Sequence, residues 1–137
     1  AELAASAENR VTKYMRLNRE MTAQRPDLPE KTYAALADTI RELQQRGVRV
    51  VLFTPPYWQG YNERYQAADP EPIHLMYASL ARLQDELGVE YYDFSADAAI
   101  SANPALFKDS DHLNSCGARE FSERLAQAMR AQQAVQP

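Results

Sequence analysis

The clearest β-strand in this sequence is VRVVLFT, residues 48–54, which runs directly into Pro55 and Pro56. From Val50 onward the segment is apolar and rich in β-branched residues, which is typical of a strand buried on both faces. It ends abruptly because a proline cannot donate a hydrogen bond to a neighbouring strand. We therefore predict a buried strand that ends at Thr54.

A second strand is predicted at residues 89–94, VEYYDF. The residues between the two strands place apolar side chains at helical spacing, and Gly88 is well suited to end that helix. Asp69 and Pro70 fit the N-cap and the first position of the same helix. A strand, a helix and a strand in this order form a right-handed parallel crossover, so the predicted fold class is α/β.

Flanking helices are predicted at residues 1–21, 29–46 and 115–130, with loops at 57–65 and 95–104. The chain then divides into an N-terminal helical segment (1–28), an α/β domain (29–131) and a frayed tail (132–137). A buried parallel sheet usually has more than two strands. Either further strands are not recognisable in the sequence, or this parallel βαβ core with flanking helices is the C-terminal part of a larger sheet, which we favour.

The overall composition excludes several classes of function. The 137-residue chain has a net charge of −4, which argues against nucleic acid as a partner. Arg10, Lys13, Arg16 and Arg19 recur every three residues, which predicts the solvated face of the first helix. No apolar run approaches the ~20 residues that span a bilayer, and no signal peptide is recognisable at the start.

Metals and cofactors are not expected either. The single cysteine, Cys116, rules out an internal disulfide and a cysteine-based zinc site. The two histidines, His74 and His112, lie far apart in the sequence. The chain also lacks an initiator methionine, so we expect it to be a mature or excised piece of a longer protein.

The best candidate for chemistry is FKDSDHLN, residues 107–114, just ahead of the last predicted helix. Asp109 and Asp111 precede His112 by three positions and one position. A carboxylate beside an imidazole fixes the tautomer of the ring and stabilises the imidazolium that forms on protonation. The simpler alternative is a surface histidine in an Asp-rich loop that caps a helix, with Asn114 as the N-cap.

Aromatic residues gather after the first strand. Tyr57, Trp58, Tyr61 and Tyr65 follow the point where the chain leaves the sheet, which is where ligands of open α/β sheets bind. Their rings could line an acyl or sugar pocket, or they could pack against the edge of the sheet. Tyr57 and Trp58 are the better candidates for substrate binding because they lie nearest the end of the strand.

The segment 109–112, DSDH, with the wider string 107–114 and the following Gly117, resembles the D-x-x-H block of the SGNH hydrolases, also called the GDSL lipase/esterase superfamily. Residues 47–57 resemble the strand and loop of envelope-associated branches of that family. The resemblance covers roughly residues 30–130, the C-terminal half of such a domain, and implies a flavodoxin-like three-layer fold.

The resemblance also implies roles for individual residues. His112 would be the general base that activates a serine and later protonates the leaving alcohol, and Asp109 would orient it. Asp111 directly precedes His112, so we expect its side chain to point away from the imidazole and to bind backbone or begin the turn. Asp111 also joins Tyr57 and Trp58 as a candidate substrate-binding residue.

Two blocks of the family are absent. The sequence contains neither a G-D-S triplet for the nucleophile nor a G-x-N-D block for the oxyanion hole, and none of its serines has a strand–turn–helix setting. A Cys116–His112 pair is conceivable, but a packed free thiol is the better prediction. Nucleophile and oxyanion hole are therefore expected upstream of Ala1.

The leading hypothesis is the C-terminal portion of an ester hydrolase or O-acyltransferase that acts on cell-envelope glycan or lipid-linked acyl esters. By resemblance the parent protein would be extracytoplasmic or membrane-anchored. The alternative is a non-catalytic binding or assembly module, possibly a homodimer that completes its sheet across an interface.

Overall fold

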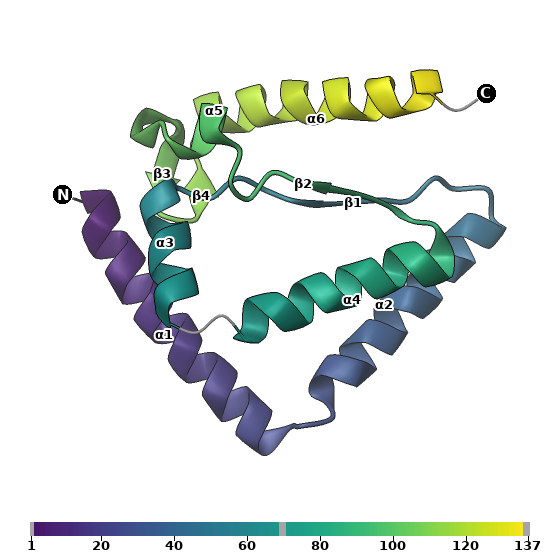
Figure 1. The fold of residues 1–137 in the computed structure, drawn as a ribbon, viewed down its shortest axis with the longest axis horizontal. Helices are drawn as coiled ribbons and strands as arrows, with labels where there is room; N and C mark the ends of the chain where they lie inside the picture. The colour runs from purple at the N-terminus through teal and green to yellow at the C-terminus, as the bar shows by residue number, and fades with distance from the viewer. Residues whose placement is uncertain (1, 69–70, 136–137) are drawn as a thin grey trace.

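The computed structural model describes residues 2–68 and 71–135, so the predicted cap at Asp69 and Pro70 lies outside the described residues. Viewed as in Figure 1, helices α1, α2 and α6 outline an open triangle, with a short sheet along one side. The elements in chain order are α1 (Glu2–Gln24), α2 (Leu28–Gln45), β1 (Val51–Thr54), α3 (Gln59–Ala68), α4 (Glu71–Leu87), β2 (Glu90–Asp93), α5 (Ala98–Ser101), a 3-10 turn η1 (Pro104–Leu106), β3 (Phe107–Asp109), β4 (His112–Leu113) and α6 (Ser115–Val135).

The predicted helix boundaries at glycine are confirmed. Gly47 follows α2 with φ +75° and Gly88 follows α4 with φ +60°, a conformation that other residues adopt only with strain. Pro29 lies in the first turn of α2, where its missing N–H leaves no hydrogen bond unmade. The two glycines therefore set where the chain leaves each helix to enter the strand that follows.

The predicted parallel crossover is present. β1 and β2 pair in parallel, with Val51 opposite Glu90 and Thr54 opposite Asp93. Phe94 continues the pairing by donating its backbone N–H to the carbonyl of Thr54 at 3.0 Å. The chain is thus a mixed α/β protein, mostly helical, and the described residues place two strands in this sheet.

Helices lie on both faces of the β1–β2 pair (Figure 1), but the pair is only partly buried. Thr54 is the single buried residue of β1, so the prediction of a strand buried on both faces is wrong. On one face, Phe121 of α6 contacts the rings of Phe53 and Phe94, with centroid distances of 5.4 and 5.3 Å. On the other face, Leu52 packs against a cluster formed by α2 and α4. Successive side chains of β1 therefore point to opposite helical layers, as expected for a strand.

The buried residues form separate clusters. One joins α2 and α4 around Ile40 and Leu83, and a second joins α1 to the aromatic side chains of α3. A third surrounds Ile100, Leu106, Phe107 and Phe121 between the β3–β4 hairpin and α6. Trp58 packs against both the second and the third cluster.

Several segments differ from the sequence prediction. Residues 59–68 form α3 rather than a loop, because Tyr57, Tyr61 and Tyr65 recur every four residues and their rings contact one another in series. Asp97 and Asn103 cap short helical turns within the predicted loop at 95–104.

Two further differences concern the C-terminal part of the chain. Residues 107–113 form a short antiparallel hairpin that the sequence analysis missed. Helix α6 ends at Val135 rather than near residue 130, and the last two residues of the predicted tail lie outside the described residues. No helix in the described ranges combines the length and the apolar composition that crossing a membrane requires.

Candidate functional site

The candidate site lies on the β3–β4 hairpin, which is fixed to the start of α6. Asn114 caps that helix, because its Oδ1 accepts hydrogen bonds from the backbone N–H groups of Cys116 and Gly117, both at 3.0 Å. Its Nδ2 donates to the carbonyl of Ala105 at 2.7 Å. A Cβ at Gly117 would lie 2.2 Å from the Leu106 carbonyl oxygen, so the close approach of α6 to η1 requires glycine there.

Asp109 and His112 form the predicted pair. Oδ1 of Asp109 lies 2.9 Å from Nδ1 of His112 and also accepts the backbone N–H of His112 at 2.9 Å. The carboxylate therefore favours the tautomer with hydrogen on Nδ1, which leaves Nε2 as the proton acceptor. The His112 side chain is 59% exposed, so an approaching group can reach the ring.

Arg10 of α1 binds both carboxylates of the loop. Its Nη2 lies 2.9 Å from Oδ2 of Asp109, and its Nε lies 2.8 Å from Oδ1 of Asp111. The prediction that Arg10 lies on a purely solvated face is therefore wrong. The guanidinium instead joins two aspartates about a hundred positions away in the sequence, in the bidentate manner that arginine permits.

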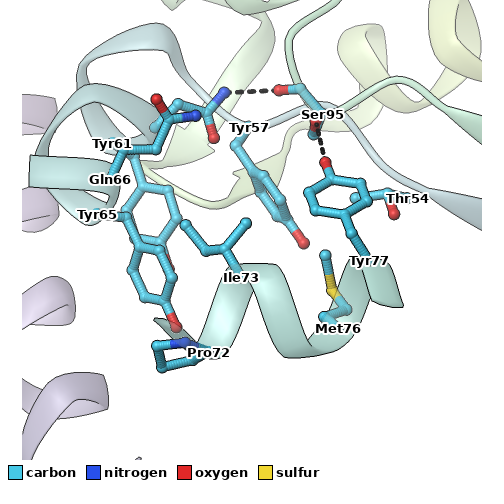
Figure 2. Close-up of a pocket in the computed structure, with 11 residues that line it drawn as sticks. Thr54, Tyr57, Tyr61, Tyr65, Gln66, Pro72, Ile73, Met76, Tyr77 and Ser95 are labelled. Carbon is cyan, nitrogen blue, oxygen red and sulfur yellow. Dashed lines mark hydrogen bonds between the residues drawn. The ribbon is translucent and has the colours of Figure 1, made fainter. Parts of the chain in front are cut away.

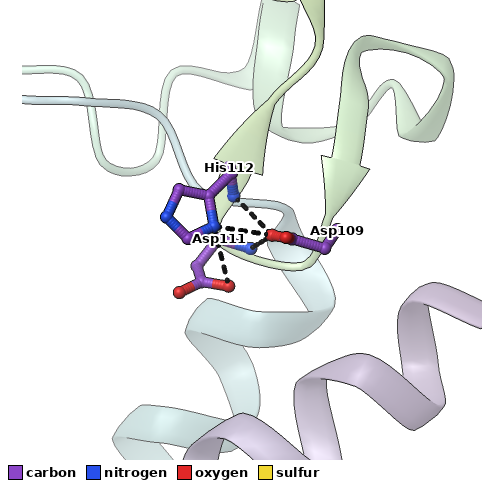
Figure 3. A group of neighbouring side chains, drawn as sticks. All are labelled: Asp109, Asp111 and His112. Carbon is purple, nitrogen blue, oxygen red and sulfur yellow. Dashed lines mark hydrogen bonds and ion pairs between the residues drawn. The ribbon is translucent and has the colours of Figure 1, made fainter.

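The side chain of Asp111 lies beside the imidazole, contrary to the expectation that it would point away. Its Oδ1 is 3.6 Å from Nδ1 of His112, and Figure 3 shows both carboxylates next to the same ring. Tyr14 donates a hydrogen bond to Oδ2 of Asp111 at 3.4 Å. The irregular hairpin register and the pull of Arg10 turn the carboxylate inward, where only 8% of the side chain is exposed.

The pKa values of Asp109 and Asp111 are shifted in opposite directions. Burial alone would raise the pKa of Asp109, but the hydrogen bond with His112, the backbone N–H of Asp111 and the charges of His112 and Arg10 outweigh it and hold that pKa below its usual value. Burial raises the pKa of Asp111, against the opposing pull of Arg10 and His112, and repulsion from Asp109 adds to the rise. Asp109 is thus the more acidic of the two carboxyl groups beside the ring.

No nucleophile is paired with His112. Within residues 2–68 and 71–135, no serine hydroxyl and no thiol forms a hydrogen bond with its ring. Ser6 and Ser110 lie nearby, but their hydroxyls bond to each other at 3.2 Å, and Ser110 is fully buried in the hairpin turn. Cys116 is exposed rather than packed.

The cluster could in principle hold a cation. Asp109, Asp111 and His112 each offer one ligand atom, and these atoms lie within 4.8 Å of one another. Arg10, however, already supplies positive charge to both carboxylates. The arrangement therefore fits proton transfer at the histidine better than metal coordination.

The structure separates the two aromatic candidates. Tyr57 lines a cavity beside the ends of β1 and β2. Trp58 instead packs over Gly60, where a Cβ would meet the indole at 2.4 Å, and bridges two buried clusters. The backbone N–H of Trp58 donates to the carbonyl of Ser110 at 3.2 Å, so this segment also supports the hairpin.

Sequence reasoning missed the contribution of α1. Ser6, Arg10 and Tyr14 all contact the hairpin turn. They recur every four residues, which places them on one face of a helix, and that spacing was the available signal. Comparisons of the chain with protein-family models, curated proteins and solved structures found no match.

Proposed function

We propose that this chain is the C-terminal portion of an SGNH-type ester hydrolase or O-acyltransferase and supplies the histidine and aspartate of a Ser-His-Asp triad. The observation that carries the proposal is the 2.9 Å contact of Asp109 Oδ1 with His112 Nδ1, which leaves Nε2 of an exposed ring available. Acyl transfer needs a general base held in this way.

In the proposed reaction, Nε2 of His112 takes the proton of a serine hydroxyl as the serine oxygen attacks the acyl carbonyl. The same nitrogen then protonates the leaving alcohol, and the second half-reaction runs in reverse with water or an acceptor hydroxyl. Asp109 stabilises the imidazolium, and Arg10 keeps that carboxylate ionised and in place. The serine and the oxyanion hole come from a part of the protein outside this chain.

The open form of the sheet supports this division. Among the described residues β1 and β2 pair only with each other, so each strand has an unpaired edge. Phe53 of β1 remains 47% exposed. We propose that further strands of a flavodoxin-like three-layer domain cover these groups. The proposed substrate is an acyl ester on a cell-envelope glycan or lipid, in an extracytoplasmic or membrane-anchored parent protein.

The deciding experiment compares His112→Ala with His74→Ala in the full-length protein, using hydrolysis of p-nitrophenyl acetate as the readout. Loss of His112 should abolish activity without lowering the melting temperature, because the side chain is mostly exposed. His74 is the matched control, since it is the only other histidine of this 137-residue chain and is also exposed. Equal activity of the two variants would refute the proposal.

A second experiment, on the purified chain alone, tests whether the nucleophilic serine lies outside this chain. The purified chain is treated with a fluorophosphonate, and its intact mass is measured. No adduct is expected, because no hydroxyl of the described residues is hydrogen-bonded to His112. A stoichiometric adduct that disappears in His112→Ala would show that the chain holds its own activated serine.

A second candidate function is an assembly module that pairs with a second copy of the chain. The unpaired edges of β1 and β2 favour it, since exposed strand edges promote association. In that case His112→Ala would be silent, while changes at Tyr57 or Trp58 would alter assembly measured by analytical ultracentrifugation.

A further inference from the structure

A cavity of about 160 Å³ opens beside the carboxyl ends of β1 and β2, between α3 and α4 (Figure 2). Ligands of open α/β sheets bind at this edge. The chain segment that lines the cavity also reaches the hairpin: the N–H of Tyr57 donates to the carbonyl of Ser95, and the N–H of Trp58 donates to that of Ser110. Tyr57 and Trp58 therefore link the wall of the cavity to the loop that carries Asp109 and His112.

Its sides are aromatic and apolar. Tyr57, Tyr61 and Tyr65 line it in series, and the last two rings are stacked at 25° with centroids 5.7 Å apart. Figure 2 shows these rings beside Ile73 and Met76, which project from α4. Such faces suit a ring that is apolar above and below.

The polar groups of the cavity fall into two sets. Asn62 and Tyr77 are engaged within the protein: Asn62 donates to the carbonyl of Ser95 at 2.6 Å, and Tyr77 donates to Oδ2 of Asp93 at 2.7 Å. By contrast, the hydroxyls of Tyr57 and Tyr61 and the amide of Gln66 have no hydrogen-bond partner among the described residues. The first set fixes the shape. The second set reaches solvent, Gln66 from an exposed position, and is accessible to a ligand.

Both unpartnered phenols remain neutral donors. Burial raises the pKa of Tyr57 and of Tyr61, and the charge of Asp111 adds to the rise in each case. No lysine, arginine, aspartate or glutamate is among the described residues that line the cavity. A charged ligand would therefore find no counter-ion there, whereas a neutral one with hydroxyl groups would find donors and acceptors.

The volume limits the size of the ligand. An apolar protein cavity of about 150 Å³ accommodates benzene. The cavity here has a similar volume and is not enclosed, so it can hold one six-membered ring whose substituents extend out through the opening. We propose that the cavity binds one neutral pyranose, with its faces against the tyrosine rings and its hydroxyls on Tyr57, Tyr61 and Gln66. The assignment of this sugar to the acceptor glycan rests on the proposed function, whereas its binding does not.

The test is a titration of the purified chain with methyl β-glucopyranoside or N-acetylglucosamine, followed by amide chemical shifts in NMR. A sugar of this size should bind with a dissociation constant of about 1 mM, given the affinity available per ligand atom. The shifts should be confined to the cavity, at Tyr57, Tyr61, Gln66 and Ser95. Binding of octanoate or phenol instead of either sugar would overturn the proposal.

Two variants sharpen the test without disturbing the packing. Tyr61→Phe removes one free hydroxyl and keeps the ring, and should weaken sugar binding about threefold to tenfold. Tyr92→Phe is the matched control, because Tyr92 bonds to Glu90 and does not line the cavity. Equal affinity of the two variants would refute the assigned contact.

His112→Ala separates the two proposals. The chain with this substitution should bind the sugar as the unmodified chain does, because His112 does not line the cavity. Absence of sugar binding alongside a His112-dependent esterase would refute the cavity alone. Sugar binding alongside a His112-independent esterase would refute the proposed catalytic role alone.

Discussion

The His112 corner, formed by α1, the β3–β4 hairpin and the start of α6, is held together differently from the opposite end of the molecule, formed by α2 and α4. At the corner, charged side chains from distant parts of the sequence find partners: Arg10 contacts Asp109 and Asp111, and Arg124 contacts Asp97. At the other end, α2 and α4 share one apolar cluster and are linked across the surface by exposed pairs such as Arg82 with Glu30. Both regions contain buried apolar clusters, but only in the first do part-buried polar contacts between distant residues add to them.

The burial of the second region is incomplete. Met21, Leu36, Leu75 and Met76 are exposed and line an apolar groove of about 790 Å³ between α1, α2 and α4. The whole chain exposes 8824 Å², against roughly 7,200 Å² for a compact monomer of its mass. The comparison shows that specific polar contacts fix the candidate site, whereas the groove between α1, α2 and α4 leaves apolar side chains exposed.

The largest loss of stability is expected from a substitution in the apolar cluster between α2 and α4. Leu83 is fully buried between α2 and α4, so Leu83→Ala should lower the free energy of unfolding by about 3 kcal/mol through lost contacts and a cavity. Leu75 on the same helix is 53% exposed, so Leu75→Ala should change stability by less than about 0.5 kcal/mol. Urea unfolding monitored by circular dichroism measures both; similar losses would show that the groove is closed in solution.

The next largest loss of stability is expected from removing Arg10, which binds Asp109 and Asp111 at the His112 corner. Arg10→Met leaves the poorly exposed Asp111 without its cation and should cost about 2 kcal/mol, less than for a fully buried pair. Arg16→Met on the same helix removes an exposed contact with Glu20 at 3.8 Å and should cost less than about 0.5 kcal/mol. Thermal unfolding of the two variants compares them, and indistinguishable melting temperatures would mean that Arg10 does not hold the loop.

The smallest effect is a pH dependence that distinguishes the two aspartates. The folded-state pKa of Asp109 is lowered, so its contribution to stability is present above about pH 4 and is lost as the pH falls through that pKa. The stability advantage of the unmodified chain over Asp109→Asn should therefore shrink in acid. The pKa of Asp111 is raised, so the same comparison with Asp111→Asn should move the opposite way.

Urea midpoints at several pH values between neutral and acid test this pair of expectations. Parallel curves for the two variants would contradict the separation of the two carboxyl groups. The measurement needs no substrate, so it reports on the electrostatics of the corner independently of any activity.

Much of the fold could be predicted from the sequence because its signals are local. The β-branched strand, the helical stripes of α2 and α4 and the glycines that end them each depend on a few neighbouring residues. The β3–β4 hairpin could not be predicted in this way. Its strands are only three and two residues long, and they are held by Asn114, Trp58 and α1 rather than by their own pattern.

In the candidate site, too, contacts between sequence neighbours could be predicted and contacts between distant residues could not. The Asp109–His112 contact was predictable because the two residues lie three positions apart. The role of Arg10 was not, since it depends on tertiary packing of α1 against the hairpin. The tyrosine cavity lies between these cases. Its rings follow a four-residue spacing that runs from Tyr57 into α3, but its other side comes from α4.

The position of Trp58 gives the molecule a built-in optical reporter. It is the single tryptophan of the sequence, and its indole lies where the α1–α3 cluster meets the cluster of the hairpin and α6. Intrinsic fluorescence therefore follows the integrity of the His112 corner. The indole does not belong to the α2–α4 cluster. Local unfolding of α2 and α4 should therefore lower the helical circular dichroism signal before the emission of Trp58 changes.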